Sequence, residues 1–196
     1  MRFLFIAIFM LASNNAFSIS QEYIEESIKR AAKDAGVPVD LLRAICFAES
    51  RLKPDAYVFS DGGNNNHAFG MCQVLYRTAG DFGFKDSRCL EDFRFRKQHR
   101  NYQHCKLFGP YTNALYAAYF LKRQLDRYDQ SWINAIAAYN SGSVRICSSG
   151  WVYANRVDED GNVFRTKLYE CKKGGILNQR YVDRVLHFLN KHNKNR

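Results

Sequence analysis

Hydrophobic residues recur along this chain mainly at spacings of three and four positions, which is the pattern of helices with one apolar face. The pattern predicts helices over residues 21–35, 38 to about 50, about 112–128, 132–139 and about 179–189. Gly36 ends the first of these helices, Pro38 takes the first position of the second, and Ser131 and Asn178 cap the last two. The polar tail, residues 192–196, is expected to fray.

The apolar positions of these helices define the expected core. In the first helix Tyr23, Ile24, Ile28, Ala31 and Ala32 share one face. The later stripes are Leu41, Leu42, Ile45 and Ala48; then Leu115, Ala118, Leu121, Leu125 and Tyr128; and finally Tyr181, Val182, Val185, Leu186 and Leu189. The helix that begins at Trp132 is apolar enough to predict burial on most of its sides.

Three stretches depart from the helical pattern. Residues 54–73 alternate and contain a Gly- and Asn-rich run, which predicts short strands and turns. Residues 82–110 and 141–175 show no clear period and are expected to be irregular. Because no repeat or linker divides the chain after residue 18, we expect one α+β, predominantly helical domain over residues 19–196.

The N-terminus resembles an export signal. Arg2 is followed by ten apolar residues, 3–12, and Ala16 and Ser18 are small residues at the positions that a signal peptidase inspects. We therefore expect residues 1–18 to be removed and the mature chain to be periplasmic or extracellular. Ten apolar residues fall well short of the roughly 20 that cross a bilayer, so no stable membrane anchor is expected.

Composition and charge narrow the class of protein. The 196 residues are 46% hydrophobic and 24% charged, which suits one packed core and excludes a disordered chain or a polytopic membrane protein. The net charge of +10 favours a polyanionic partner. Because the chain is expected to be exported, a cell-surface polymer is a better candidate for that partner than nucleic acid.

All six cysteines follow the predicted signal, and an even number in an oxidising compartment indicates disulfides. We expect Cys89–Cys105 and Cys147–Cys171, because each pair brackets one irregular segment. These pairs close separations of 16 and 24 positions, each worth roughly 3 kcal/mol in the chain-entropy model.

Glu49 is the leading catalytic candidate. It lies four residues after Ile45, so its side chain leans over a partly apolar helix face. Loss of hydration there raises the pKa of a carboxyl, as a general acid near neutral pH requires. From position alone, an ordinary solvent-facing glutamate at a helix end is the alternative.

Five short blocks extend this hypothesis. They are Glu49-Ser50, Pro54-Asp55-Ala56, Gly70-Met71-Cys72-Gln73, Ala137-Ala138-Tyr139-Asn140-Ser141-Gly142 and Tyr181-Val182-Asp183-Arg184-Val185-Leu186. In order and spacing they resemble the soluble lytic transglycosylase family of lysozyme-like muramidases, over roughly residues 21–190. Two departures are Met71-Cys72, where the family usually has Leu-Met, and a longer turn over residues 61–69.

The resemblance implies a lysozyme-like fold and cleavage of peptidoglycan between N-acetylmuramic acid and N-acetylglucosamine, without cofactor or metal. Glu49 would be the single acid and base, and 1,6-anhydromuramic acid would be the product. The implied substrate contacts are Ser50, Gln73, Tyr139, Asn140 and Tyr181. Glycan strands are the expected partner, and a secretion or lysis apparatus is a further candidate.

The resemblance also brings Cys46 and Cys72 close to the floor of the cleft. They could form a third disulfide that ties the helix of Glu49 to the segment of Gln73. Two buried free thiols are the alternative, since cysteine is among the most buried residues even when it is unpaired.

Two other functions stay open. Asp55 or Asp61 could act as a second carboxyl, which would favour a hydrolytic, goose-type-like muramidase, although both have the sequence context of turn residues. The other function is a disulfide-stapled glycan-binding module that has lost catalysis. The presence of Glu49, Gln73 and Asn140 together favours an active enzyme.

Other chemistries fit the sequence less well. Cys89, His99, His104 and Cys105 match no usual zinc spacing, and a peptidase based on Cys72 and His67 lacks a recognisable third group. Residues 93–100 mix aromatic and basic residues as single-strand nucleic-acid grooves do, but a solvated loop is the simpler interpretation for an exported protein.

Overall fold

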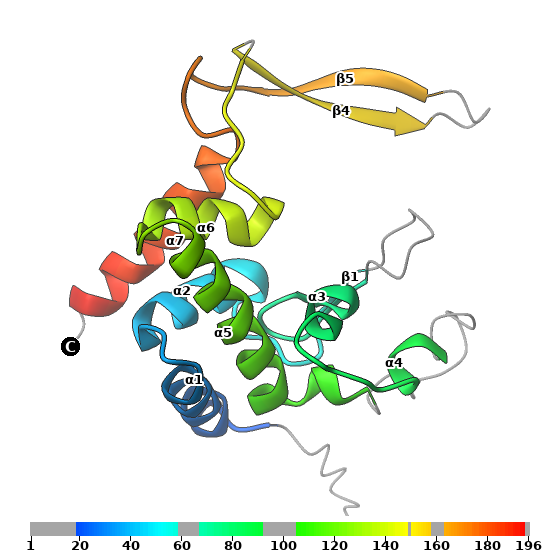
Figure 1. Ribbon diagram of the computed structural model, residues 1–196, viewed down its shortest axis with the longest axis vertical. Helices are drawn as coiled ribbons and strands as arrows, with labels where there is room; N and C mark the ends of the chain where they lie inside the picture. Colours follow the sequence, from blue (N-terminus) through cyan, green and yellow to red (C-terminus); the bar gives the residue numbers. More distant parts are fainter. Residues whose placement is uncertain (1–18, 59–66, 92–104, 149, 158–162, 195–196) are drawn as a thin grey trace, which may run out of the picture.

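The computed structural model describes residues 19–58, 67–91, 105–148, 150–157 and 163–194, and the predicted signal lies outside them. The structure consists of helices, one small sheet and one hairpin (Figure 1). In chain order they are α1 Gln21–Ala35, α2 Val39–Ser50, β1 Tyr57–Val58, β2 Ala68–Phe69, β3 Val74–Leu75, α3 Tyr76–Gly80, α4 Arg88–Glu91, η3 Lys106–Phe108, α5 Pro110–Arg127, α6 Trp132–Ser141, β4 Trp151–Val157, β5 Val163–Glu170 and α7 Gln179–Lys194. The predicted α+β, mostly helical class is confirmed.

Local signals fix most helix ends. The Ser20 hydroxyl accepts from the Tyr23 N–H at 3.1 Å, and Gly36 closes α1 in the left-handed conformation. Ser131 caps α6 as predicted. Pro38 precedes α2 as its N-cap and is not its first helical residue, whereas Pro110 starts α5 two residues before the predicted point.

Helix α5 crosses the middle of the molecule and packs on α1, α2 and α6, while α7 packs on α2 and α6 (Figure 1). The predicted stripes supply most of the largest fully buried side chains, among them Ile28, Leu41, Leu42, Ile45, Leu121, Leu125, Val182 and Val185. Two expectations were wrong. Tyr23 is 53% exposed, and Trp132 and Ile133 project from the first turn of α6, so that helix is buried only toward its C-terminal half.

The predicted β region is a three-stranded antiparallel sheet with strand order β1-β2-β3. Phe69 stands opposite both Tyr57 and Val74 and is fully buried. The Gly- and Asn-rich run between β1 and β2, which was predicted to contain turns, lies outside the described residues.

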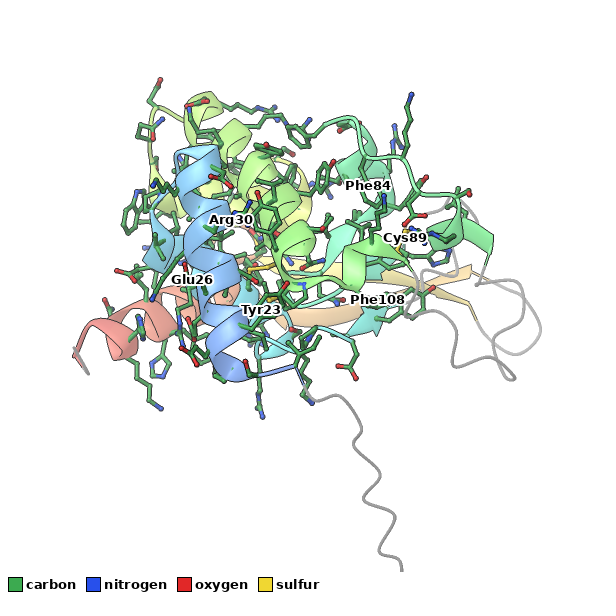
Figure 2. All side chains as sticks on the ribbon, turned by 90° about the horizontal axis from the view of Figure 1, so that it is seen from below. Tyr23, Glu26, Arg30, Phe84, Cys89 and Phe108 are labelled. Carbon is green, nitrogen blue, oxygen red and sulfur yellow. A yellow bond between two sulfur atoms is a disulfide. The ribbon has the colours of Figure 1, made fainter. Side chains whose placement is uncertain are left out.

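The segment predicted to be irregular over residues 82–110 contains α4 and η3, and the Cys89–Cys105 disulfide joins them. Asp86 helps to hold this segment, because it accepts from Arg88 Nε at 2.7 Å and from the Lys106 N–H at 2.9 Å. The hydrogen bond from Arg88 lowers the pKa of the Asp86 carboxyl. In Figure 2, Phe84, Cys89 and Phe108 are labelled to the right of α1, which carries Tyr23, Glu26 and Arg30.

The second segment, residues 141–175, was predicted incorrectly, because it forms the antiparallel hairpin β4–β5. Its strands are rich in aromatic and β-branched residues, and an Asp-Gly pair stands between them in the sequence. These are strand and turn signals, but they show no helical period. The predicted Cys147–Cys171 disulfide closes its base. There the Cys171 N–H donates to the Gly150 carbonyl at 2.8 Å.

Two expectations about α7 also need correction. Asn178 does not cap the helix with its side chain, because its Oδ1 accepts no hydrogen bond from the described residues, while its Nδ2 donates to the Ala137 carbonyl at 2.9 Å. The C-terminal tail stays helical to Lys194, and His192 lies 3.9 Å from Asp40 of α2. In the described part of the chain, no helix has both the length and the apolar character needed to span a membrane.

A buried asparagine joins α5 to the small sheet. Asn113 Oδ1 accepts from the Cys72 N–H at 2.8 Å, and its Nδ2 donates to the carbonyls of Phe69 and Leu107 at 2.7 and 2.8 Å. Gly70 is the glycine that this arrangement requires, since a Cβ there would lie 2.6 Å from the Leu107 carbonyl and would overlap Asn113. Its φ of +68° excludes most other residues as well.

We therefore expect Asn113→Ala to destabilise the protein by about 3 kcal/mol, because it removes three hydrogen bonds to backbone groups of buried residues. Urea unfolding measures the loss. Asn134→Ala, in a half-buried part of α6, is the matched control and should change stability by less than about 0.5 kcal/mol. Equal stability of the two variants would contradict this role of Asn113.

Candidate active site

Glu49 lies in the last turn of α2, where its side chain is half-buried. The Tyr181 hydroxyl of α7 donates a 2.6 Å hydrogen bond to Glu49 Oε1. Burial raises the pKa of the Glu49 carboxyl, while the hydrogen bond from Tyr181 and the positive charge of Arg184 partly oppose that shift. The carboxyl therefore holds its proton to a higher pH than an ordinary glutamate does.

Two buried tyrosines surround this carboxyl. Tyr139 of α6 donates its hydroxyl to the Cys72 carbonyl at 3.0 Å. Burial and the negative charge of Glu49 raise the pKa of both Tyr139 and Tyr181 well above the ordinary range for tyrosine. Both hydroxyls consequently stay protonated and act as hydrogen-bond donors at neutral pH.

The segment Gly70 to Gln73 is fastened to α2. The Cys46–Cys72 disulfide connects them, which confirms the third bridge and excludes the two free thiols. The Ser50 hydroxyl donates to the Met71 carbonyl at 2.7 Å. Because Cys46 precedes Glu49 by nearly one helical turn and Ser50 follows it directly, the position of Glu49 relative to Gln73 is fixed from both sides.

The side chains of Gln73 and Asn140 are each held in one orientation by a hydrogen bond of their amide group. Gln73 Nε2 donates to the Gly70 carbonyl at 2.9 Å, and Asn140 Oδ1 accepts from Asn178 Nδ2 at 3.1 Å. The carbonyl oxygen of Gln73 and the amide hydrogens of Asn140 are consequently the groups that can face a ligand.

A pocket of about 460 Å³ opens beside these residues. Glu49 does not line the pocket, but Tyr139 does. Tyr139 is close enough to Glu49 for the negative charge of that carboxylate to raise the pKa of the Tyr139 hydroxyl. The lining residues are Gln73, Val74, Leu75, Thr78, Ala117, Phe120, Arg123, Tyr139, Asn140, Ser141, Gly142 and Arg145. The pocket therefore combines an apolar wall with amides and two guanidinium groups.

Backbone strain gathers around this site. Arg51 and Leu52, directly after α2, and Gln73 all have φ between +51° and +60°, a region that residues other than glycine seldom adopt. Such strain persists only where surrounding contacts hold the backbone in that conformation. Here two of the strained residues, Arg51 and Leu52, form the turn that directly follows the helix of Glu49.

The predicted site residues thus come together from four parts of the chain. Ser50 binds protein groups, since its hydroxyl also accepts from the Lys53 N–H at 2.9 Å, and its predicted contact with substrate stays a prediction. Asp55 is exposed, and Asp61, His99 and His104 lie outside the described residues. Within the described ranges no cluster of three metal-ligating side chains occurs, and Cys72 and Cys89 are both in disulfides.

Comparison with known proteins places this geometry in a family. The profile of the Transglycosylase SLT domain matches residues 26–152. This chain belongs to the Transglycosylase SLT domain family. The match includes Glu49, Gln73, Tyr139 and Asn140 and ends within β4, so Tyr181 lies beyond it.

One similar solved structure is an inactive mutant of the lytic transglycosylase Slt from Pseudomonas aeruginosa. It is 24% identical to this chain, with a TM-score of 0.42, over 60% of this chain. The matched part is 16% of that much longer chain. The family match, together with the mostly helical fold and its small sheet, agrees with the lysozyme-like class expected for this SLT domain.

Sequence reasoning missed several residues that build the site of this SLT domain. Asn113, Arg123 and Arg145 were not singled out, and Asn178 was predicted only as a helix cap. Asn113 had a detectable signal, because it is a polar residue one position before Ala114 on the buried face of α5. Arg123 and Arg145 had none, since arginines are common along the whole sequence.

The raised pKa of Glu49 makes a prediction about stability. The folded protein binds this proton more tightly than the unfolded chain, so stability falls as pH rises from the ordinary carboxyl range, near 4.3, through the raised value. Glu49→Gln keeps an acceptor for Tyr181 and removes the buried charge. We expect a melting temperature at pH 7 equal to or above that of the wild type, with the advantage shrinking toward pH 4.

Glu26→Gln is the matched control, because Glu26 lies on the exposed side of α1, and its melting temperature should follow the wild type at both pH values. A Glu49→Gln protein that is clearly less stable than wild type at pH 7 would contradict the desolvation of this carboxyl.

Proposed function

We propose that this SLT domain is a lytic transglycosylase that cleaves the β-1,4 bond between N-acetylmuramic acid and N-acetylglucosamine in peptidoglycan. The observation that supports this best is the half-buried Glu49 carboxyl bonded to Tyr181 beside a pocket that no acidic residue of the described chain lines. One carboxyl with a raised pKa is what this reaction needs, whereas ordinary glycoside hydrolysis normally uses two.

In the proposed reaction Glu49 first gives its proton to the glycosidic oxygen, and the bond from that oxygen to C1 of the muramoyl sugar breaks. The Glu49 carboxylate then takes the proton of the C6 hydroxyl of the same sugar, whose oxygen bonds to C1 and closes a 1,6-anhydro ring. The acid is thereby restored. Because the attacking hydroxyl belongs to the substrate, the site has to orient it and exclude water.

The hydrogen bonds around Glu49 suit both halves of this cycle. Tyr181 occupies Oε1, so Oε2 is the oxygen that exchanges the proton with substrate. The same bond stabilises the carboxylate formed midway. Burial has the opposite effect, and the balance leaves a pKa above that of an ordinary glutamate, as a general acid requires.

The amides are proposed to hold the substrate. The carbonyl oxygen of Gln73 can accept from an N-acetyl N–H, and Asn140 Nδ2 can donate to a carbonyl oxygen of the sugar. The reaction is expected outside the cytoplasm, consistent with three disulfides and the predicted signal over residues 1–18.

Product analysis tests the reaction type. Digestion of purified peptidoglycan should give disaccharide products that end in 1,6-anhydromuramic acid and are lighter by one water than hydrolysis products, as measured by mass spectrometry. A predominance of reducing-end muramic acid would instead indicate a hydrolytic muramidase with a second carboxyl, and Asp61 would be the first to test.

Substitution tests the role of Glu49. We expect Glu49→Gln to lower turnover by at least about 100-fold, because an amide neither gives nor takes the proton. Binding to cell walls should persist. Glu26→Gln, the exposed control, should retain wild-type turnover. Retention of a tenth of wild-type activity by Glu49→Gln would move the catalytic role elsewhere, and a wild-type protein that binds walls without turnover would favour the glycan-binding module.

A further inference from the structure

The solvent face of α7 carries a basic row, which consists of Arg180, Arg184, His187 and Lys191. All four residues are exposed. Because residues three and four positions apart share one face of a helix, these side chains form a single line, with neighbouring Cβ atoms roughly 5–6 Å apart. The line covers roughly 16 Å of helix at a rise of 1.5 Å per residue. The opposite face of α7, which begins with Tyr181, is buried in the core.

The charges of this row are not neutralised by ion pairs of their own. Asp183 is the acidic residue among the described side chains of α7, and it accepts from Gln179 Nε2 at 2.8 Å. Within the described ranges, no ion pair joins Arg184 or Lys191 to a carboxylate. The row therefore presents positive charge to the solvent.

Two basic side chains next to Lys191 differ in this respect. Arg43 and His192 line a small pocket together with Lys191, but both have partners in the fold. Arg43 Nη2 bonds to Glu25 Oε1 at 2.7 Å, which connects α2 to α1, and His192 lies 3.9 Å from Asp40 of α2. Charges that connect helices are thus paired here, whereas Lys191 has no such role.

The basic row begins next to the candidate active site. Arg180 directly precedes Tyr181 in the sequence, and the guanidinium carbon of Arg184 lies 5.3 Å from the centroid of the Tyr181 ring. The hydroxyl of that tyrosine bonds to Glu49 at 2.6 Å. A ligand along the row would therefore extend from the site of Glu49 toward the C-terminal end of α7.

The other side chains of α7 distinguish between anionic partners. A helix that lies on a membrane inserts exposed apolar residues, but none of the exposed large apolar side chains of the described residues belongs to α7. Single-stranded nucleic acid stacks its bases on exposed rings. In α7, however, Tyr181 is buried and Phe188 packs edge-on against Phe47, with 4.6 Å between ring centroids. A single line of cations suits a flexible chain that carries an anion in each repeat and has no bases.

We propose that the basic row of α7 binds a linear polymer that has a phosphate group in each repeat and no bases. Arginine and lysine supply charge-assisted hydrogen bonds to phosphate oxygens, and His187 adds a ring N–H between them. The surface does not include Glu49, so the inference goes beyond the proposed function and does not require it. If both hold, a phosphate-bearing polymer of the cell surface would keep the enzyme on the wall, with its active site at one end of the row.

Calorimetry with a polyglycerol phosphate chain at low ionic strength tests this proposal. Wild type should bind the chain, and the affinity should fall steeply as salt is added, because the charges are exposed. Glycerol phosphate alone should not bind measurably, since it reaches one cation at a time. Arg180→Glu and Lys191→Glu, at the two ends of the row, should each weaken binding of the chain about tenfold.

Lys85→Glu is the matched control, because it changes the net charge by the same amount at another exposed lysine. Lys85 lies between α3 and α4, which Figure 1 shows to the right of α5, whereas α7 lies to its left. The affinity of this variant should stay within about twofold of the wild type. Far-UV circular dichroism checks that all variants fold. The binding measurement needs no turnover, so a protein that fails to cleave peptidoglycan contradicts the proposed function and leaves this test intact.

Three results would overturn the polymer site. The first is no binding of the chain by wild type, and the second is an equal loss in Lys85→Glu and Lys191→Glu, which would assign the effect to overall charge. The third is tighter binding to single-stranded DNA of equal phosphate number, or to phosphatidylglycerol vesicles, than to polyglycerol phosphate. That result would assign the row to nucleic acid or to a membrane surface.

Discussion

The half-buried carboxyl of Glu49 is the group around which the rest of the structure is arranged. Removing a carboxylate from water is unfavourable, and burial raises its pKa accordingly. The hydrogen bond from Tyr181 limits that shift without reversing it. Two helices far apart in the sequence, α2 and α7, must pack together for this bond to form, so the chemistry depends directly on the helical core.

The same helix is fixed to the turn between β2 and β3 by two links, the Cys46–Cys72 disulfide and the hydrogen bond from the Ser50 hydroxyl to the Met71 carbonyl. A third link comes from α5, where Asn113 accepts from the Cys72 N–H. Together they fix a turn in which Gln73 has a positive φ. The surrounding contacts offset the strain of that turn. The turn places the amide group of Gln73 in the same site as the Glu49 carboxyl.

The hairpin β4–β5 is inserted between two residues of the site, because Asn140 precedes it and Tyr181 follows it. Its base must therefore be rigid, or the two residues would move relative to each other. The Cys147–Cys171 disulfide, the Ile146–Ile176 pairing and the bond between Asn178 and Asn140 meet this need. The same base holds the backbone of Arg145, which lines the pocket beside Tyr139.

The sequence by itself determined the five long helices, the Gly36 and Ser131 caps, the small sheet and two of the disulfides, because these follow from periodicity, local capping chemistry and cysteine spacing. It also singled out Glu49, Gln73, Tyr139, Asn140 and Tyr181, although their roles stay proposals. It missed the hairpin, because the aromatic and β-branched runs and the Asp-Gly pair that signal it carry no helical period. Only the tertiary structure decided that Cys46 joins Cys72, that Asn178 bonds to α6 instead of capping α7, and that Arg123 and Arg145 share a pocket. Each of these depends on distances between residues far apart in the chain, which no local pattern encodes.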